Sequence, residues 1–292
     1  MLISTLINGR LKTPPLQDDP LVPWWSFTKT VLAATALTLV RDGRLDLDAS
    51  LPEGVFTLRQ LLRHEAGLAD YGELPEYHAA VANHESAWPV GEMMQRLDGH
   101  RLRYSPGTGW RYSNVGFMLV AQIIERAADL SIADTVRQQV LKPLDLSTVR
   151  FATERAELNG NHLSYDPGWV YHGLLIGPVS QAARLLDGVL AGDVLPDNLI
   201  REMQATRVLG GPMAGRPWLT PGYALGLMRG AIEGDLILAG HTGSGPGSVV
   251  AVYRCDVGDS AVCCAVHSVG AQEAGIEKLV VQEIREALAV TR

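Results

Sequence analysis

The sequence has little cysteine and no long hydrophobic run, and each shortage excludes a class of protein. Only three cysteines occur in 292 residues, and Cys263 and Cys264 are adjacent in an apolar run that predicts a strand. Because neighbouring strand residues point to opposite faces, this odd set does not fit a disulfide framework, and we expect reduced core thiols. No stretch approaches the roughly 20 apolar residues of a membrane helix, since the run over residues 30–40 is followed at once by Arg41 and Asp42.

Signals for export, nucleic-acid binding and metal binding are also missing. The first residues lack a basic start followed by a sustained apolar stretch, so we expect a cytoplasmic protein. The formal net charge of -7 opposes attraction to nucleic acid or anionic lipid, and we expect neither as a partner. The eight histidines are scattered, with no His-x-His or His-Glu-x-x-His spacing, which disfavours a zinc hydrolase. We expect neither a metal nor a cofactor.

The elements predicted for the first half of the chain are mainly helical. Asn8 and Gly9 form a turn signal that predicts a short strand or hairpin at the start. Residues 26–40 are apolar on nearly all faces, which predicts a buried helix. Thr57 and Gln60 match a capping box, so a short helix is expected over residues 58–65, with Gly67 placed to end it. Further helices are predicted over residues 115–124 and 181–190.

The later part of the chain predicts strands and a final helix. Apolar runs bounded by glycine and acidic turns predict antiparallel strands over residues 223–228, 236–240, 248–253 and 261–267, before a helix over residues 272–290. The fold class is therefore α/β of the α+β type, with an antiparallel sheet formed by N- and C-terminal segments, flanking helices and an inserted mainly helical lobe. We assign residues 1–68 and 206–292 to the sheet domain and 69–205 to the lobe, with the catalytic cleft between them.

Ser26-Phe-Thr-Lys29 at the start of the first buried helix is the first candidate for catalysis. The spacing places a hydroxyl and an amine one turn apart, so both point the same way from a rigid scaffold. A serine hydroxyl is a weak nucleophile at neutral pH and needs a neighbour that can take its proton, which a partly desolvated lysine can do. The motif alone is common by chance, and taken alone it is better explained by a helix cap followed by a solvated lysine. A uniformly apolar helix after Lys29 favours the catalytic interpretation.

Two more motifs follow in order, and the set resembles a known superfamily. Ser26-Phe-Thr-Lys29, Tyr112-Ser-Asn114 and His241-Thr-Gly243 are similar to the three ordered motifs of the penicillin-binding protein and serine β-lactamase superfamily. The stretches at residues 61–68 and 105–107 agree with its branch of class C β-lactamases, family VIII-type esterases and D-peptidases. The resemblance covers most of the chain from Ser26 onward and implies a β-lactamase/transpeptidase-like fold.

The resemblance implies a role for each motif residue around the nucleophile Ser26. It makes Tyr112 the base that works with Lys29. A phenol with a pKa of ~10 can act at pH 7 only if cations lower that pKa, and we expect Lys29 and the dipole of the helix after Asn114 to do so. Asn114 is expected to offer its amide to the substrate.

The third motif is expected to form the edge strand beside the nucleophile. An extended substrate can add itself to such a strand along His241, Thr242 and Gly243, where glycine permits close backbone approach. The backbone N–H groups of Ser26 and Ser244 would form the oxyanion hole, each donor contributing ~3 kcal/mol. Residues 243–247 are also consistent with a flexible turn between strands.

The implied activity is hydrolysis of a small ester or amide through an acyl-enzyme, of the esterase or D-amino-acid peptidase type. A histidine with a reference pKa of ~6.5 is mostly neutral at pH 7, so His241 weakens the case for a dedicated β-lactamase, many of which carry lysine there. A true β-lactamase or DD-carboxypeptidase acting on a β-lactam or peptide stays open. So does a non-catalytic penicillin-binding sensor or scaffold, and the sequence leaves the oligomeric state undetermined. The aromatic residues of 165–173 predict a lining of the cleft or a packed loop.

Overall fold

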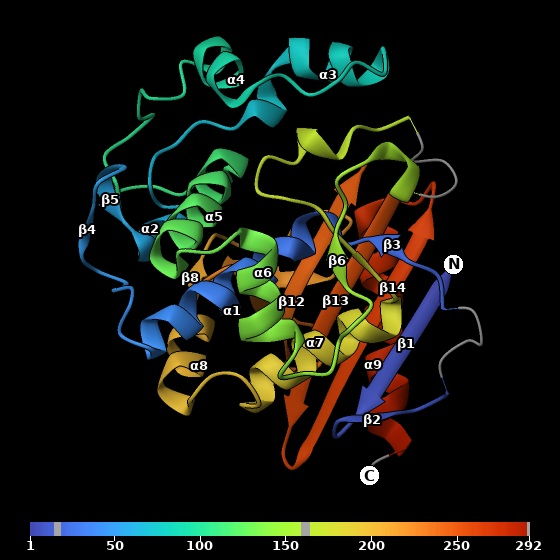
Figure 1. The fold of residues 1–292 in the computed structure, drawn as a ribbon. Helices are drawn as coiled ribbons and strands as arrows, with labels where there is room; N and C mark the ends of the chain where they lie inside the picture. Colours follow the sequence, from blue (N-terminus) through green and yellow to red (C-terminus); the bar gives the residue numbers. More distant parts are fainter. Residues whose placement is uncertain (15–18, 159–163, 291–292) are drawn as a thin grey trace.

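The computed structural model describes residues 1–14, 19–158 and 164–290 and contains a large antiparallel sheet (Figure 1). In the described part of the chain this sheet has nine strands, in the order β2-β1-β14-β13-β12-β11-β10-β8, with β9 paired to β11. The strands are β1 Leu2–Ile7, β2 Arg10–Leu11, β8 Arg207–Val208, β9 Trp218–Thr220, β10 Gly222–Tyr223, β11 Met228–Ile232, β12 Leu236–Gly245, β13 Ser248–Val257 and β14 Ser260–Val269. The N-terminal strand therefore completes a sheet made mostly by the C-terminal third of the chain, as predicted.

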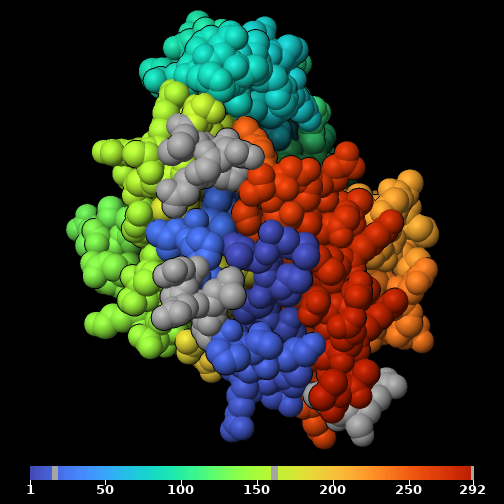
Figure 2. All heavy atoms as spheres, turned by 90° about the vertical axis from the view of Figure 1, so that its right-hand side faces the viewer, coloured from blue at the N-terminus to red at the C-terminus, as the bar shows by residue number. Residues whose placement is uncertain are grey.

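The sheet pairs segments from the two ends of the chain. In the register of β1 and β14, Leu2 lies opposite His267 and Ile7 opposite Val262. The predicted hairpin is confirmed, because β1 and β2 pair through a turn in which Asn8 has a left-handed φ of 47°. Figure 2 shows the N-terminal segment lying against the C-terminal segments on one face of the molecule.

Helices cover both faces of the sheet. Because successive strand residues point to opposite faces, they contribute to two separate hydrophobic cores. Helix α7, Val179–Ala191, packs on β1, β13 and β14, while α9, Glu273–Val290, packs on the same strands and on β12. Cys263 belongs to the larger core, which contains residues of α7, and Cys264 to the core that contains residues of α9. All three cysteines are buried and free, which confirms the prediction of core thiols in place of disulfides.

The remaining helices and short strands form the helical part of the molecule. The helices are α1 Thr28–Arg41, α2 Leu58–Leu62, α3 Pro75–Ala82, α4 Val90–Leu97, α5 Asn114–Ala128, α6 Ile132–Val136 and α8 Asp197–Gln204. Two small sheets accompany them, formed by β3 Val22–Pro23, β7 Leu175–Gly177 and β6 Arg150–Phe151, and by β4 Ser50–Leu51 and β5 Gly54–Thr57. Helices α3 and α4 lie at one end of the molecule (Figures 1 and 2). In the described ranges no helix is long and apolar enough to cross a membrane.

Two predicted elements differ from the structure. The strand expected over residues 223–228 is a tight turn, in which Tyr223 of β10 pairs with Met228 of β11. Gly226 has a φ of +67°, and a Cβ there would lie 2.5 Å from that of Ala33, so packing against α1 requires a glycine turn. The helix predicted over residues 58–65 has its capping box but ends at Leu62.

Helix α2 is shorter than predicted because the left-handed residue that ends it comes earlier in the chain than Gly67. His64, with a φ of 59°, adopts the left-handed conformation that Gly67 was expected to supply. His64 is buried, and its Nδ1 accepts the backbone N–H of Ser113 at 3.1 Å. The turn thereby joins the end of α2 to the start of α5, which carries part of the site.

Candidate active site

Ser26 lies in a short 3-10 turn, Trp25–Phe27, that leads into α1. Trp25 holds a left-handed φ of 43°, so the chain turns sharply just before the serine. The N–H groups at the start of such a helical segment have no partner within it, which leaves the amide of Ser26 available to an incoming oxygen. Lys29 follows one turn later and is fully buried.

The structure brings the first two motifs together on the Ser26 hydroxyl. Tyr112 OH donates a hydrogen bond to Ser26 Oγ at 2.8 Å, and Lys29 Nζ lies 3.1 Å from the same oxygen. Ser113 caps α5 by accepting the N–H of Gly116, and this cap fixes the segment on which Tyr112 stands. Residues 86 positions apart in the sequence thus meet at one oxygen.

The third motif lies directly beside the serine, on strand β12. A Cβ at Gly243 would lie 2.6 Å from the backbone nitrogen of Ser26 and 2.7 Å from the carbonyl oxygen of Trp24. Only glycine therefore allows the strand to approach the nucleophile turn this closely. Residues 243–245 belong to β12 and pair with β13, so the turn that the sequence also allowed here is confined to the residues after Gly245.

Asn114 holds Lys29 and is itself held by Asp70. Its Oδ1 accepts from Lys29 Nζ at 2.7 Å, and its Nδ2 donates to Asp70 Oδ1 at 3.0 Å. Both ends of the amide thus have protein partners, although Asn114 also lines the cavity beside Ser26. Asp70 was not identified from the sequence, because a single aspartate after α2 carries no motif spacing.

The electrostatic environment makes Lys29 a proton acceptor near neutral pH. Burial lowers the pKa of Lys29 from 10.5 to about 7, while the negative charge of Asp70 opposes that shift. At pH 7 a substantial fraction of the amine is therefore neutral. A neutral amine within hydrogen-bond distance of a serine hydroxyl is the arrangement that a general base requires.

The pKa of Tyr112 moves in the opposite direction to the one expected from the sequence. Desolvation of the partly buried phenol raises its pKa above the ordinary value, and the hydrogen bond to Ser26 opposes this shift only in part. Lys29 and the helix dipole therefore do not lower the pKa of Tyr112 as expected, because burial disfavours the phenolate more strongly. Tyr112 is a neutral hydrogen-bond donor at pH 7.

His172 is a second residue that the sequence did not single out for chemistry. Its Nε2 lies 3.3 Å from Lys29 Nζ, and its side chain is buried. The aromatic segment that contains it fulfils both of the predicted roles, since Tyr165 and His172 are buried and also line a small cavity of about 90 Å³ beside Ser26. No sequence spacing relates His172 to Lys29, 143 residues earlier.

His241 is neutral in this structure. Its Nδ1 lies 2.7 Å from the carbonyl oxygen of Thr242, which can only accept, so Nδ1 carries the proton. Its Nε2 then accepts the hydroxyl hydrogen of Tyr223 at 3.0 Å. Burial lowers the pKa of His241 to about 3, which confirms the expectation that this residue carries no charge at pH 7.

A cavity of about 660 Å³ opens beside Ser26, Tyr112, Asn114 and the third motif. It is also lined by Arg216 and Glu273, which were not predicted. Further lining residues are Trp110, Leu209, Gly210, Gly211, Met213, Pro221, Gly222, Tyr223 and Met228. The cavity is large enough for a small substrate and mostly neutral in its walls.

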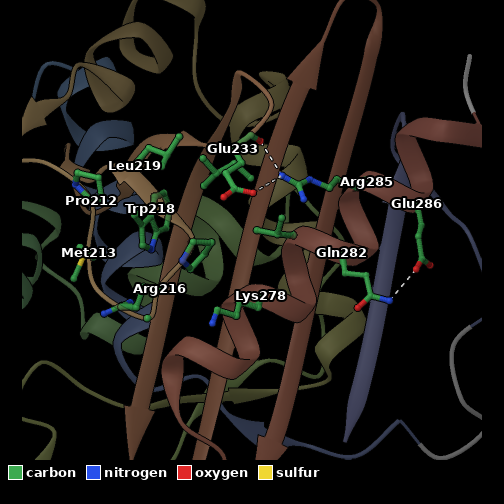
Figure 3. Close-up of a pocket in the computed structure, with 14 residues that line it drawn as sticks. Pro212, Met213, Arg216, Trp218, Leu219, Glu233, Lys278, Gln282, Arg285 and Glu286 are labelled. Carbon is green, nitrogen blue, oxygen red and sulfur yellow. Dashed lines mark hydrogen bonds and ion pairs between the residues drawn. The ribbon is translucent and has the colours of Figure 1, made fainter.

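A second cavity, of about 610 Å³, lies between the segment 212–219 and α9 (Figure 3). It shares Met213 and Arg216 with the first cavity, but none of the motif residues line it. Figure 3 shows Lys278, Gln282, Arg285 and Glu286 along α9 at its border. The residues that the sequence predicted for the site therefore converge on the first cavity. Among the residues described, no group of three or more His, Cys, Asp or Glu side chains is placed to hold a metal ion.

Comparison with known proteins identifies the family of the chain. A family model described as Beta-lactamase matches residues 7–282, so the chain belongs to the beta-lactamase family. Penicillin-binding protein 4* of Bacillus subtilis is 31% identical over 168 residues, which cover 54% of this chain and 36% of that protein. Esterase EstB of Burkholderia gladioli is 28% identical over 165 residues, covering 49% of this chain and 41% of the esterase. The match thus spans well under half the length of these relatives.

The fold is also similar to that of solved structures. The D-amino acid amidase from Ochrobactrum anthropi SV3 superposes with a TM-score of 0.78 over 99% of this chain and 94% of the amidase, at 21% identity. At that identity the similarity establishes the fold alone. The predicted β-lactamase/transpeptidase-like architecture is confirmed.

Proposed function

We propose that this protein is a serine hydrolase that forms an acyl-enzyme at Ser26 and acts on a small ester or amide. The observation that carries the proposal is the placement of Ser26 Oγ at a cavity, within 2.8 Å of Tyr112 OH and 3.1 Å of Lys29 Nζ. A nucleophile flanked by a base and a hydrogen-bond donor is the minimal arrangement for acyl transfer. Membership of the beta-lactamase family supports the same reaction class.

The hydrogen bonds around Lys29 are consistent with a neutral amine that accepts from the serine. A neutral amine has two N–H groups and one lone pair. Asn114 Oδ1 at 2.7 Å and His172 Nε2 at 3.3 Å can accept the two N–H groups. The lone pair then remains for the Ser26 hydroxyl hydrogen. Lys29 thus serves as the base in this proposal, and Tyr112 as a donor to Ser26 Oγ.

The reaction proceeds in two halves. Ser26 Oγ attacks the carbonyl carbon as its proton passes to Lys29, and the backbone N–H groups of Ser26 and Ser244 stabilise the oxyanion. Collapse of the intermediate breaks the bond to the leaving group, which takes the proton from Lys29, directly or through Tyr112. Water then attacks the acyl carbon as neutral Lys29 accepts a proton from it; the bond between that carbon and Ser26 Oγ breaks, Lys29 returns the proton to Oγ, and the carboxylic acid is released. Every atom and proton is returned, so no cofactor takes part.

The neutral His241 supports an ester or D-amino-acid derivative over a β-lactam as the substrate. Penicillins and the DD-carboxypeptidase substrates carry a carboxylate, and an uncharged imidazole whose Nε2 already bonds Tyr223 offers it no cation. The esterase EstB and the D-amino acid amidase among the similar proteins agree in their named activities with this choice. The cytoplasmic, reducing location stays a prediction. So does the division into a sheet domain, residues 1–68 and 206–292, and a helical lobe, residues 69–205.

Active-site labelling tests the proposal directly. A fluorescent fluorophosphonate should label the wild-type protein at Ser26 and should not label Ser26→Ala. The unlabelled wild-type protein should hydrolyse p-nitrophenyl butyrate or a D-alanyl anilide faster than nitrocefin. Rapid nitrocefin hydrolysis would reverse the ranking of substrates. Labelling without any turnover would favour a penicillin-binding sensor, and absence of labelling would refute the serine hydrolase.

A further inference from the structure

The only charged side chains that line the active-site cavity, among the residues that the structure describes, are Arg216 and Glu273. Arg216 is held by two carboxylates. Its Nη1 lies 2.9 Å from Glu273 Oε2, and its Nε donates to Glu277 Oε2 at 2.7 Å. One positive and two negative charges give this group a net charge of -1. The cation therefore has no unpaired charge to offer a ligand.

Glu277 and Glu273 differ in how much of their hydrogen-bonding capacity is used. Glu277 is 1% exposed and accepts from Thr242 Oγ1 at 2.6 Å and from Trp218 Nε1 at 3.1 Å as well as from Arg216. Glu273 is 39% exposed, and it accepts from Ser244 Oγ at 2.6 Å through Oε1 and from Arg216 through Oε2. A carboxylate has about four lone-pair positions, so Glu273 keeps about two for a ligand.

The position of Glu273 places its free acceptors close to the acyl group of a bound substrate. Ser244, to which it bonds, lies next to Gly243, and Gly243 contacts the backbone of Ser26. Glu273 is thus one hydrogen bond from the residue whose N–H is proposed to hold the oxyanion. Its carboxylate also lines the same cavity as Ser26.

We infer that the cavity selects acyl groups that carry a protonated amine over those that carry a carboxylate, and that Glu273 binds this amine. The inference rests on the proposed function, because it concerns the acyl group that Ser26 accepts. An ammonium gains a charge-assisted hydrogen bond from Glu273. A carboxylate loses its hydration in the cavity, meets the net negative charge of the Arg216 group, and finds only a neutral imidazole at His241.

Three phenyl esters of matched size test the inference. They are phenyl 3-aminopropanoate, phenyl butanoate and monophenyl succinate, which end in an ammonium, a methyl and a carboxylate. We expect kcat/KM at pH 7.5 to fall in that order, by about tenfold or more from the first to the second, as one charge-assisted hydrogen bond implies. Glu273→Gln should bring the ratio of the amine ester to the succinate ester toward one, since it removes the charge of the acceptor and one of the two negative charges that pair with Arg216.

Glu286→Gln is the matched control. It makes the same change on the same helix, but Glu286 lines the second cavity and bonds Gln282 (Figure 3). Its ratios should equal those of the wild type. Equal rates for the three esters in the wild type, or an unchanged ratio in Glu273→Gln, would overturn the inference while leaving the serine hydrolase intact. Failure of the fluorophosphonate to label Ser26 would instead refute the proposed function.

Discussion

Nε2 of His172 lies 3.3 Å from Nζ of Lys29, in a buried position where the histidine is neutral because burial and the lysine lower its pKa. The imidazole thus acts as an acceptor for one N–H of the amine. This bond favours the ammonium form of Lys29, whose hydrogen bonds are stronger than those of the neutral amine. It also fixes the direction of the lone pair when the amine is neutral.

Replacing His172 should therefore change the pH dependence of activity as well as its size. His172→Phe removes the acceptor, so the acid limb of kcat/KM, which we expect near pH 7, should move to lower pH. The loss of orientation should lower kcat by roughly 10- to 100-fold, less than the ~10²- to 10⁴-fold of complete loss of a general base. His172→Gln retains an acceptor oxygen and should recover part of the rate and the original midpoint. A loss of rate with no movement of the limb in either variant would assign His172 to packing alone.

Lys29 should also make the stability of the fold depend on pH. The pKa of Lys29 is about 7 in the folded protein, against 10.5 without burial. Between these values the unfolded chain binds a proton that the folded protein does not, so the free energy of unfolding rises with pH across this window. Lys29→Met has no amine at this position and therefore lacks this pH-dependent contribution to the free energy of unfolding. The difference in unfolding free energy, wild type minus Lys29→Met, should rise by up to about 4 kcal/mol from pH 6.5 to 10.

Urea denaturation at several pH values measures that difference. Lys278→Met serves as the control, because Lys278 is exposed on α9, whereas Lys29 is buried. Its difference from the wild type should stay flat. Parallel curves for the wild type and Lys29→Met would contradict the shifted pKa.

Tyr112→Phe distinguishes the two candidate bases. Because Tyr112 is a neutral donor to Ser26 Oγ at 2.8 Å, its removal should lower kcat by roughly 10²- to 10⁴-fold. The acid limb of kcat/KM should nevertheless stay near pH 7, since it reports Lys29. Disappearance of that limb in Tyr112→Phe would show that the phenol is the base, as the sequence resemblance implied.

The order of helices and strands was predicted well from the sequence. The prediction failed where a contact with a distant residue decides the local structure. The strands after residue 236 were found because apolar runs bounded by glycine identify them without further context. The stretch 223–228 has the same composition, yet it turns at Gly226, whose close contact with Ala33 of α1 exists only in the folded chain. Similarly, α2 ends at Leu62 and the chain turns at His64, ahead of Gly67, where the buried imidazole bonds the start of α5.

In the site, too, residues within motifs were predicted, and residues that reach the site only through folding were not. Ser26 and Lys29 were predicted from their spacing at the start of a helix, and Tyr112 from the resemblance of its motif to the superfamily. Asp70 and His172 reach Asn114 and Lys29 only through folding, and neither has neighbours that mark it. The pKa of Tyr112 was predicted to be lowered but is raised, because it depends on desolvation, which a sequence does not reveal.

Gly243→Ala should separate catalysis from folding at the strand beside the nucleophile. A methyl group there would lie 2.6 Å from Ser26 N and 2.7 Å from Trp24 O, so β12 must move away from the turn. Overpacking of this kind costs ~1–3 kcal/mol of stability. The displaced Ser244 amide should cost at least about 100-fold in kcat, as expected for loss of an oxyanion donor.

Gly91→Ala is the control for the glycine substitution. Gly91 lies on α4, and a Cβ there has no atom within 4 Å, so alanine should preserve kcat and increase stability by up to ~1 kcal/mol. Thermal unfolding and p-nitrophenyl butyrate hydrolysis of both variants provide the comparison. If Gly243→Ala stayed folded and retained wild-type kcat, the close approach of β12 would have no part in holding the oxyanion, and the second donor would have to be sought elsewhere around the cavity.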